Sequence, residues 1–102
     1  MLVHNVYFYL KPELTPAQRE EFRAQGLESL RPISALKELY VGRPAALPPR
    51  PVVDASYDFA ITCLFASLAA HNEYQVDPLH LAFVARFKDR WQRVQIYDAA
   101  SA

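Results

Sequence analysis

The sequence predicts a single α+β domain, built from a four-stranded antiparallel sheet with helices on one face. The elements follow the order strand, helix, strand, strand, two short helices, strand, which is a β-α-β-β-α-β plan. The first strand is largely apolar on both faces, whereas helices of the same chain can cover only one of them. With 102 residues there is room for one core, so we expect one domain spanning residues 1–102. The uncovered face predicts a homodimer, in which the sheets of two copies close into an α/β barrel.

The first strand is expected over residues 3–10, where the side chains alternate between two faces. One face carries His4, Val6, Phe8 and Leu10, and the other carries Val3, Asn5, Tyr7 and Tyr9. An antiparallel strand with one solvated face would show a polar set on that side. Since neither set is polar, the pattern indicates cover on both sides.

A helix is predicted to begin after Thr15, which serves as N-cap. Pro16 takes the first helical position and Gln18 completes a capping box. Pro32 ends the helix, because the residue before a proline is disfavoured in the helical region. The buried stripe of this helix consists of Phe22, Leu27 and Leu30.

The central part of the chain predicts two strands joined by a stiff connector. The strands are expected over residues 35–41, closed by Gly42, and over residues 57–65. Residues 43–51 contain four prolines, which favour an extended connector over a hairpin turn. A PxxP ligand for a partner domain is the alternative interpretation of the same prolines.

Two short helices and a strand complete the chain. Ser67 can cap a helix that runs to Tyr74, and Asp77 followed by Pro78 starts another that runs to about residue 88. Residues 91–97 have the pattern of the last strand.

The composition excludes several classes of partner. Eleven basic residues balance eleven acidic ones, so nucleic acid and anionic membrane surfaces are not expected partners. No segment has the apolar run of a signal peptide or a membrane span, and we expect a cytoplasmic protein. Cys63 is the only cysteine, which leaves no intrachain disulfide and no cysteine-based metal site. It is expected to be a small packing residue.

His80 is the candidate catalytic residue. It lies on the buried stripe of the last helix, near the helix N-terminus, where the helix dipole and apolar neighbours both favour a neutral imidazole. A neutral imidazole near pH 7 can act as a general base. Tyr74 can orient that imidazole or donate a hydrogen bond to an enolate oxygen. In the alternative, His80 is a core residue whose nitrogens are satisfied by the backbone or by the Tyr74 hydroxyl.

The other polar candidates are weaker. His4 is expected to point toward the helices and His80, as a pocket residue or as a plain buried polar residue, and His71 is expected to be exposed. A metal ion held by His4, His80 and Asp77 is not predicted, because Asp77 already caps a helix and no metal motif has this spacing. We therefore expect neither a metal nor another cofactor.

The chain resembles the stress-responsive dimeric α/β-barrel (Dabb) family over residues 2–98. The resemblance is densest over residues 74–83, where Tyr74 and His80 are six apart with a proline between them. Further signatures are His4-Asn5-Val6, Val41-Gly42 and Ser56-Tyr57-Asp58-Phe59-Ala60. The resemblance implies a ferredoxin-like monomer and a barrel-forming homodimer.

The family includes stress-induced proteins and a plant polyketide cyclase. In the cyclase, a catalytic Tyr and His match Tyr74 and His80, and a pocket-lining first-strand His matches His4. The chain departs from the cyclase at Arg23 and Gly26, where the cyclase helix carries aromatics, and in its proline-rich connector. These departures imply a substrate of different shape.

The predicted function is binding of a small ketide-like or aromatic ligand in an apolar pocket of the homodimer. If the protein is an enzyme, we expect cofactor-free cyclase or lyase chemistry with His80 as base and Tyr74 as its partner. The expected lining residues are His4, Val6, Phe8, Phe22, Ile61, Leu68, Phe83 and Trp91. The alternatives are a non-catalytic stress-associated protein in which the barrel dimer is structural, and a quinol or haem monooxygenase that uses Asn5 and His80.

Overall fold

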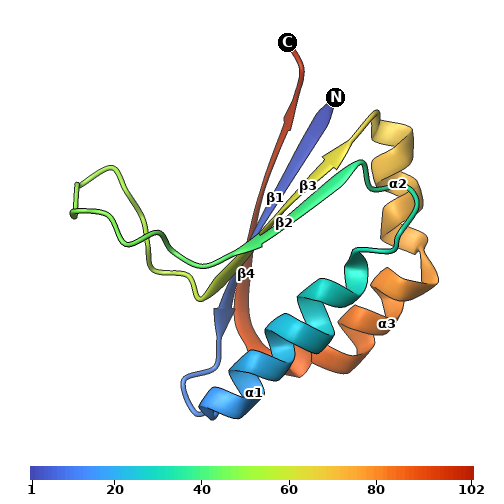
Figure 1. Cartoon of the computed structure of the whole chain (residues 1–102). Helices are drawn as coiled ribbons and strands as arrows, with labels where there is room; N and C mark the ends of the chain where they lie inside the picture. Colours follow the sequence, from blue (N-terminus) through green and yellow to red (C-terminus); the bar gives the residue numbers. More distant parts are fainter.

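The computed structural model describes all 102 residues and shows an antiparallel sheet with helices on one face (Figure 1). The strand order is β2-β3-β1-β4, so β1 and β3 are central. This arrangement confirms the predicted α+β class. The strands are β1 (Leu2–Leu10), β2 (Glu38–Gly42), β3 (Phe59–Phe65) and β4 (Trp91–Ala100). The helices are α1 (Pro16–Glu21), η1 (Phe22–Gly26), η2 (Leu27–Leu30), α2 (Leu68–Val76), α3 (Pro78–Phe87) and η3 (Lys88–Arg90).

The strand register places chemically different side chains next to His4. In β1, His4 pairs with Cys63 of β3 on one side and with Asp98 of β4 on the other. Directly paired residues of antiparallel strands project from the same face of the sheet. His4 is buried under the helices, so Cys63 and Asp98 also project toward the helices.

The predicted helix starts are confirmed by their hydrogen bonds. Thr15 and Gln18 form the reciprocal capping box at the start of α1. The Ser67 hydroxyl accepts a hydrogen bond from the backbone N–H of the third residue of α2, and the Asp77 carboxylate accepts one from the second residue of α3. Asp77 is therefore committed to helix capping, as expected.

The first helix was predicted as one continuous α-helix, but the structure divides it into three segments. After α1 the chain forms a π-helical segment, η1, and then a 3₁₀ segment, η2. Phe22 and Leu27 are five residues apart, a spacing that fits i→i+5 bonding better than the α-helical period. Because of this change both side chains are completely buried. Gly26 completes the adjustment, since a Cβ there would lie 3.2 Å from the Phe87 ring and 3.3 Å from that of Phe83.

Three strand ends differ from the prediction by two residues or more. β2 begins at Glu38, because the preceding residues form turns that include a Leu36 N–H to Ile33 carbonyl hydrogen bond. β3 begins at Phe59, two residues later than predicted. β4 continues to Ala100, because its pairing with β1 extends to Leu2.

The proline-rich connector contains no strand or helix between β2 and β3, in agreement with its composition. It projects from the sheet on the side away from the helices (Figure 1). No helix of the chain has the length and apolar character needed to cross a bilayer.

Candidate active site between the sheet and helices α2 and α3

A cavity of about 190 Å³ lies between the sheet and helices α2 and α3. Its polar end is formed by His4, Tyr74, Gln75 and His80, and no charged Lys, Arg, Asp or Glu side chain lines it. The remaining lining residues are Val6, Phe8, Ile61, Phe83, Val84, Trp91, Val94 and Ile96. The arrangement is an apolar chamber with a few convergent polar groups, the usual form of a small-molecule site.

The structure brings eight of the ten predicted site residues to this cavity. They are His4, Val6, Phe8, Ile61, Tyr74, His80, Phe83 and Trp91. It does not bring Phe22 or Leu68 there. Phe22 is completely buried and does not line the cavity, although its ring stacks on that of Phe83 with the centroids 6.0 Å apart; Leu68 is 62% exposed at the start of α2.

Four lining residues were not predicted. Sequence periodicity could have identified three of them: Val84 lies on the buried stripe of α3, and Val94 and Ile96 share one face of the last strand. Gln75 could not have been identified from the sequence, since nothing in the local pattern distinguishes it from a surface glutamine.

The His80 imidazole has one nitrogen fixed and one free of protein partners. Its Nδ1 lies 3.2 Å from the backbone carbonyl oxygen of Gln75. Because a carbonyl can only accept, Nδ1 carries the proton, and Nε2 is left with a lone pair. Nε2 has no protein partner, while every fully buried polar side-chain atom has one. The free nitrogen is therefore open to the cavity or to solvent.

The environment of His80 favours the neutral ring. Burial is the main cause that lowers the pKa of His80, and the nearby imidazoles of His4 and His71 act in the same direction. The Gln75 carbonyl and the Asp77 carboxylate oppose this shift. The net lowering maintains the base form near neutral pH.

Tyr74 contacts His80 through its ring and Cys63 through its hydroxyl. The ring centroids of Tyr74 and His80 are 4.6 Å apart at an interplanar angle of 51°. The Tyr74 hydroxyl lies beside the Cys63 thiol, and burial raises the pKa of Tyr74 far above its usual range. Burial also raises the pKa of Cys63 to about 12, so this cysteine is an unreactive thiol. The Gln75 carbonyl, and not the Tyr74 hydroxyl, orients the His80 ring.

Two histidines, His4 and His80, line the polar end of the cavity, and His71 lies next to His4. His4 is the only buried polar or charged residue, at 3% exposure, and its Nδ1 lies 2.5 Å from a carboxylate oxygen of Asp98. The expectation that His71 is exposed is wrong: its ring is half-buried, with its centroid 5.1 Å from that of His4. His71 reaches the interior because its ring packs edge-on against both His4 of β1 and Phe65 of β3.

Asn5 lies on the other face of the sheet from the cavity. Its side chain accepts a hydrogen bond of 2.9 Å from the Thr62 hydroxyl there. His80 and Asn5 are consequently separated by the sheet, and a monooxygenase site that combines the two is not formed within one chain.

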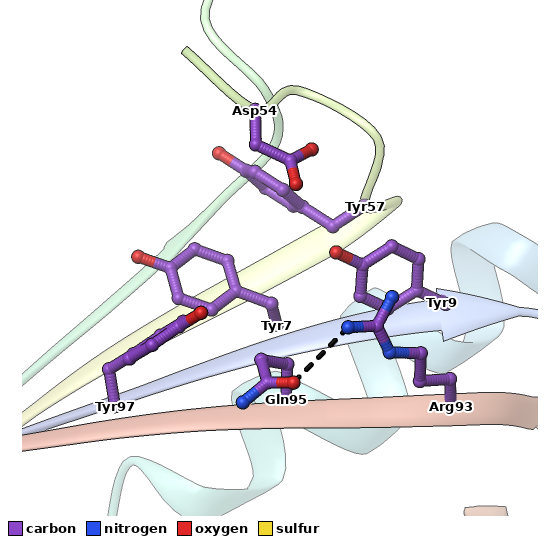
Figure 2. A pocket seen from close by; sticks show the side chains of 7 residues that line it. All are labelled: Tyr7, Tyr9, Asp54, Tyr57, Arg93, Gln95 and Tyr97. Atoms are coloured by element: carbon purple, nitrogen blue, oxygen red, sulfur yellow. Dashed lines mark hydrogen bonds between the residues drawn. The ribbon is translucent and has the colours of Figure 1, made fainter. Parts of the chain in front are cut away.

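The open face of the sheet carries a second hollow, of about 250 Å³, beneath the connector (Figure 2). Tyr7 lies at its centre, with the Tyr57 ring edge-on at 4.9 Å and the Tyr97 ring at 6.1 Å. The Arg93 guanidinium lies over the Tyr9 ring at 4.6 Å. Figure 2 shows that the side chains from β1 and β4 rise toward Asp54 and Tyr57, which lie between the connector and β3. This face is aromatic and only partly covered by its own chain.

The fold and the cavity define a ferredoxin-like α+β domain with a ligand-sized chamber between sheet and helices. The sequence profile of the stress responsive A/B barrel domain matches residues 2–101. The chain belongs to this family, which is abbreviated Dabb.

Comparison with individual proteins gives relatives with and without known activity. The chain is 25% identical over 95 residues to olivetolic acid cyclase of Cannabis sativa, covering 93% of this chain and 91% of the cyclase. A dimeric ferredoxin-like protein of unknown function from Thermobifida fusca has a similar structure, with TM-score 0.76, 22% identity and coverage of 98% and 90%. Hydroxynitrile lyase from Passiflora edulis is also similar in fold, with TM-score 0.71, 19% identity and coverage of 96% and 90%.

Proposed function

We propose that the protein is a homodimeric, cofactor-free cyclase or lyase that binds a small neutral aromatic or ketide-like compound in the cavity. The observation that carries this proposal is the His80 ring, held at Nδ1 by the Gln75 carbonyl with Nε2 unpaired beside an apolar chamber. A buried structural histidine would have both nitrogens satisfied. The cyclase activity of one relative and the lyase activity of another are consistent with this class of reaction.

The chemistry begins with proton transfer to His80. Nε2 takes a proton from a C–H next to a carbonyl, or from a hydroxyl whose carbon carries a leaving group, and the electron pair of the broken bond remains on the substrate. In the first case the resulting enolate attacks a second carbonyl of the same molecule. In the second case a carbonyl forms as the leaving group departs. The imidazolium then returns its proton to the alkoxide or to the leaving group, so that no redox partner is needed.

Tyr74 is proposed to stabilise the developing oxyanion. Its pKa is raised far above neutrality, so the hydroxyl keeps its proton and acts as a hydrogen-bond donor. Its polar neighbour within the chain is the Cys63 sulfur, which is a weak acceptor. A substrate oxygen that bears charge is the stronger acceptor and can replace it.

The cavity indicates the size and charge of the ligand. A volume of about 190 Å³ is close to that of apolar cavities of about 150 Å³ that hold benzene, and below the usual 300–1,000 Å³ of drug-sized sites. The absence of a cationic lining residue disfavours a ligand with a carboxylate or phosphate inside the chamber. The proposed ligand is therefore one ring or a short ketide, with a single polar reacting group.

The homodimer is proposed from the open face of the sheet. Tyr97 is 63% exposed there, Tyr7 and Tyr9 are only half-covered, and the connector covers part of the surface. A second copy related by two-fold symmetry would bury these rings. Sedimentation of the wild type and of Tyr97→Lys tests this point: we expect a dimer and a monomer, respectively. Leu81→Lys, a change at a residue of α3 that is 54% exposed, should remain dimeric.

The test of the ligand site is an NMR titration of the His80 ring in the absence and presence of neutral probes. Suitable probes are benzaldehyde, acetophenone and a short β-keto ester. We expect His80 to titrate below the usual range of histidine and its resonances to shift on ligand addition. A ring that neither titrates nor responds to any probe would mean a sealed core histidine and would support the non-catalytic alternative.

A further inference from the structure

We propose that His4, His71 and Asp98 form a binding site for a divalent transition metal ion, with Zn²⁺ as the preferred ion. The three residues come from β1, α2 and β4, and each offers one ligand atom, all within 4.8 Å of one another. No sequence motif joins positions so far apart in the chain. The site exists only because the fold brings them together.

The donor set matches the chemistry of such ions. Two imidazoles and one carboxylate are common ligands of zinc, and three protein ligands leave a fourth position for water or another small molecule. Hard cations such as Mg²⁺ or Ca²⁺ prefer oxygen ligands, so a site with two imidazoles selects against them. Softer ions that require thiolates are also disfavoured, because the thiol of Cys63 is buried and protonated.

The existing contacts are close to those that a metal ion requires. Ligand atoms around a tetrahedral zinc ion are about 3.3 Å apart, given zinc–nitrogen bonds of about 2.0–2.1 Å. His4 and Asp98 already meet at 2.5 Å, so the ion would separate this pair slightly as it replaces the hydrogen between them. The larger movement is required of His71, whose Nε2 is now 3.2 Å from the Gln75 side-chain amide.

The site is held firmly on one side and is accessible on the other. His4 is fixed on a central strand, and the rings of Phe65, Tyr74 and His71 surround it. Asp98 lies on the edge strand β4 with its side chain 46% exposed, and His71 is half-buried. An ion can therefore enter from the β4 edge and reach the rigid inner ligand without unfolding the chain.

The experiment is a titration of tag-free protein, stripped of metal with a chelator, with Zn²⁺ by calorimetry and with Co²⁺ by visible absorption. Cobalt reports its coordination through its d–d band, so the readout does not depend on any enzymatic activity. We expect one ion per chain. His71→Ala and Asp98→Asn should each weaken binding at least tenfold, because each removes a direct ligand. Both positions are partly exposed, and a cooperative thermal transition of each apo variant shows that it folds.

Two control variants separate this site from others nearby. Glu73→Gln changes an exposed acidic residue of the same helix, α2, and should leave the affinity unchanged. His80→Gln removes the remaining imidazole of the cluster and should also leave it unchanged. The proposal is overturned if the wild type shows no saturable binding, if His71→Ala and Asp98→Asn bind as tightly as the wild type, or if His80→Gln is the variant that loses the ion.

Discussion

Removal of the Tyr74 hydroxyl by the substitution Tyr74→Phe should leave the fold intact. Tyr74 is 1% exposed, and its ring packs against those of His80, Phe65 and His4. A phenylalanine retains these ring contacts. Only the contact of the hydroxyl with the Cys63 sulfur is lost.

The expected loss of stability is small for a buried aromatic residue. A typical hydrogen bond contributes about 0.5–1.5 kcal/mol net, and the weakness of sulfur as an acceptor places the contact with Cys63 at or below the lower end of that range. The free energy of unfolding should therefore fall by about 0.5–1 kcal/mol, which corresponds to about 2–8 °C in Tm for a domain of this size. Tyr74→Ala, in contrast, removes the ring as well and should cost about 3–5 kcal/mol.

Urea unfolding of Tyr74→Phe, Cys63→Ala and the double variant measures the contact directly. The double-mutant cycle should give a coupling energy of about 0.5 kcal/mol. In an assay for the proposed reaction, Tyr74→Phe should reduce kcat by about 10²–10³, the usual effect of removing one oxyanion donor. A loss of more than about 2 kcal/mol, or dissociation of the dimer, would show that the hydroxyl is a structural link and would refute this reasoning.

Three further predictions concern packing, protonation and the cavity. Gly26→Ala should lower the free energy of unfolding by about 1–2 kcal/mol in urea, because overpacking against Phe83 and Phe87 outweighs the gain of about 0.4–1 kcal/mol from a less flexible unfolded chain; an increase in stability would contradict the close packing of η1 on α3. Since the pKa of His80 is lowered in the folded state, the unfolded state takes up the proton first as the pH falls below about 6.5, so stability should decline from there downward. His80→Gln should remove this part of the pH dependence. If the urea midpoint falls between neutral and mildly acidic pH by the same amount in His80→Gln as in the wild type, the pKa of His80 is not lowered by folding. Val84→Trp should fill the chamber and abolish the shifts that neutral aromatic probes induce at His80, whereas persistent shifts would place the ligand elsewhere.

Local signals accounted for most of the fold. Helix starts at Thr15, Ser67 and Asp77 depend on side-chain to backbone hydrogen bonds within three residues, and these can be recognised without tertiary information. Strand ends could not be predicted as well, because they depend on pairing partners. β4 extends to Ala100 only because the start of β1 lies beside it.

The site was predictable to the extent that it follows element periodicity. His80 and His4 lie on apolar faces of their elements, and this pattern predicts that both point between the sheet and the helices. The partners that define their chemistry come from other parts of the chain. The Gln75 carbonyl fixes the His80 tautomer through a backbone atom, which no residue type reveals. Asp98 lies beside His4 because of the strand register between β1 and β4. His71 lies beside His4 because of the way α2 packs on the sheet.

The sheet separates the two surfaces on which the proposed activities depend. The cavity lies between the sheet and the helices, and the tyrosine-rich hollow lies on the opposite face. Alternate residues of β1 line the two sites: Val6 and Phe8 face the cavity, whereas Tyr7 and Tyr9 face the hollow. Effects of mutations at sites without shared partners are usually additive to within about 0.3–0.5 kcal/mol. The changes that Tyr97→Lys and Val84→Trp cause in the free energy of unfolding should therefore add in the double variant, provided that all proteins are measured at concentrations at which they are monomeric. A large coupling between them would mean that the sheet transmits the state of one face to the other, and that ligand binding and dimer formation are linked.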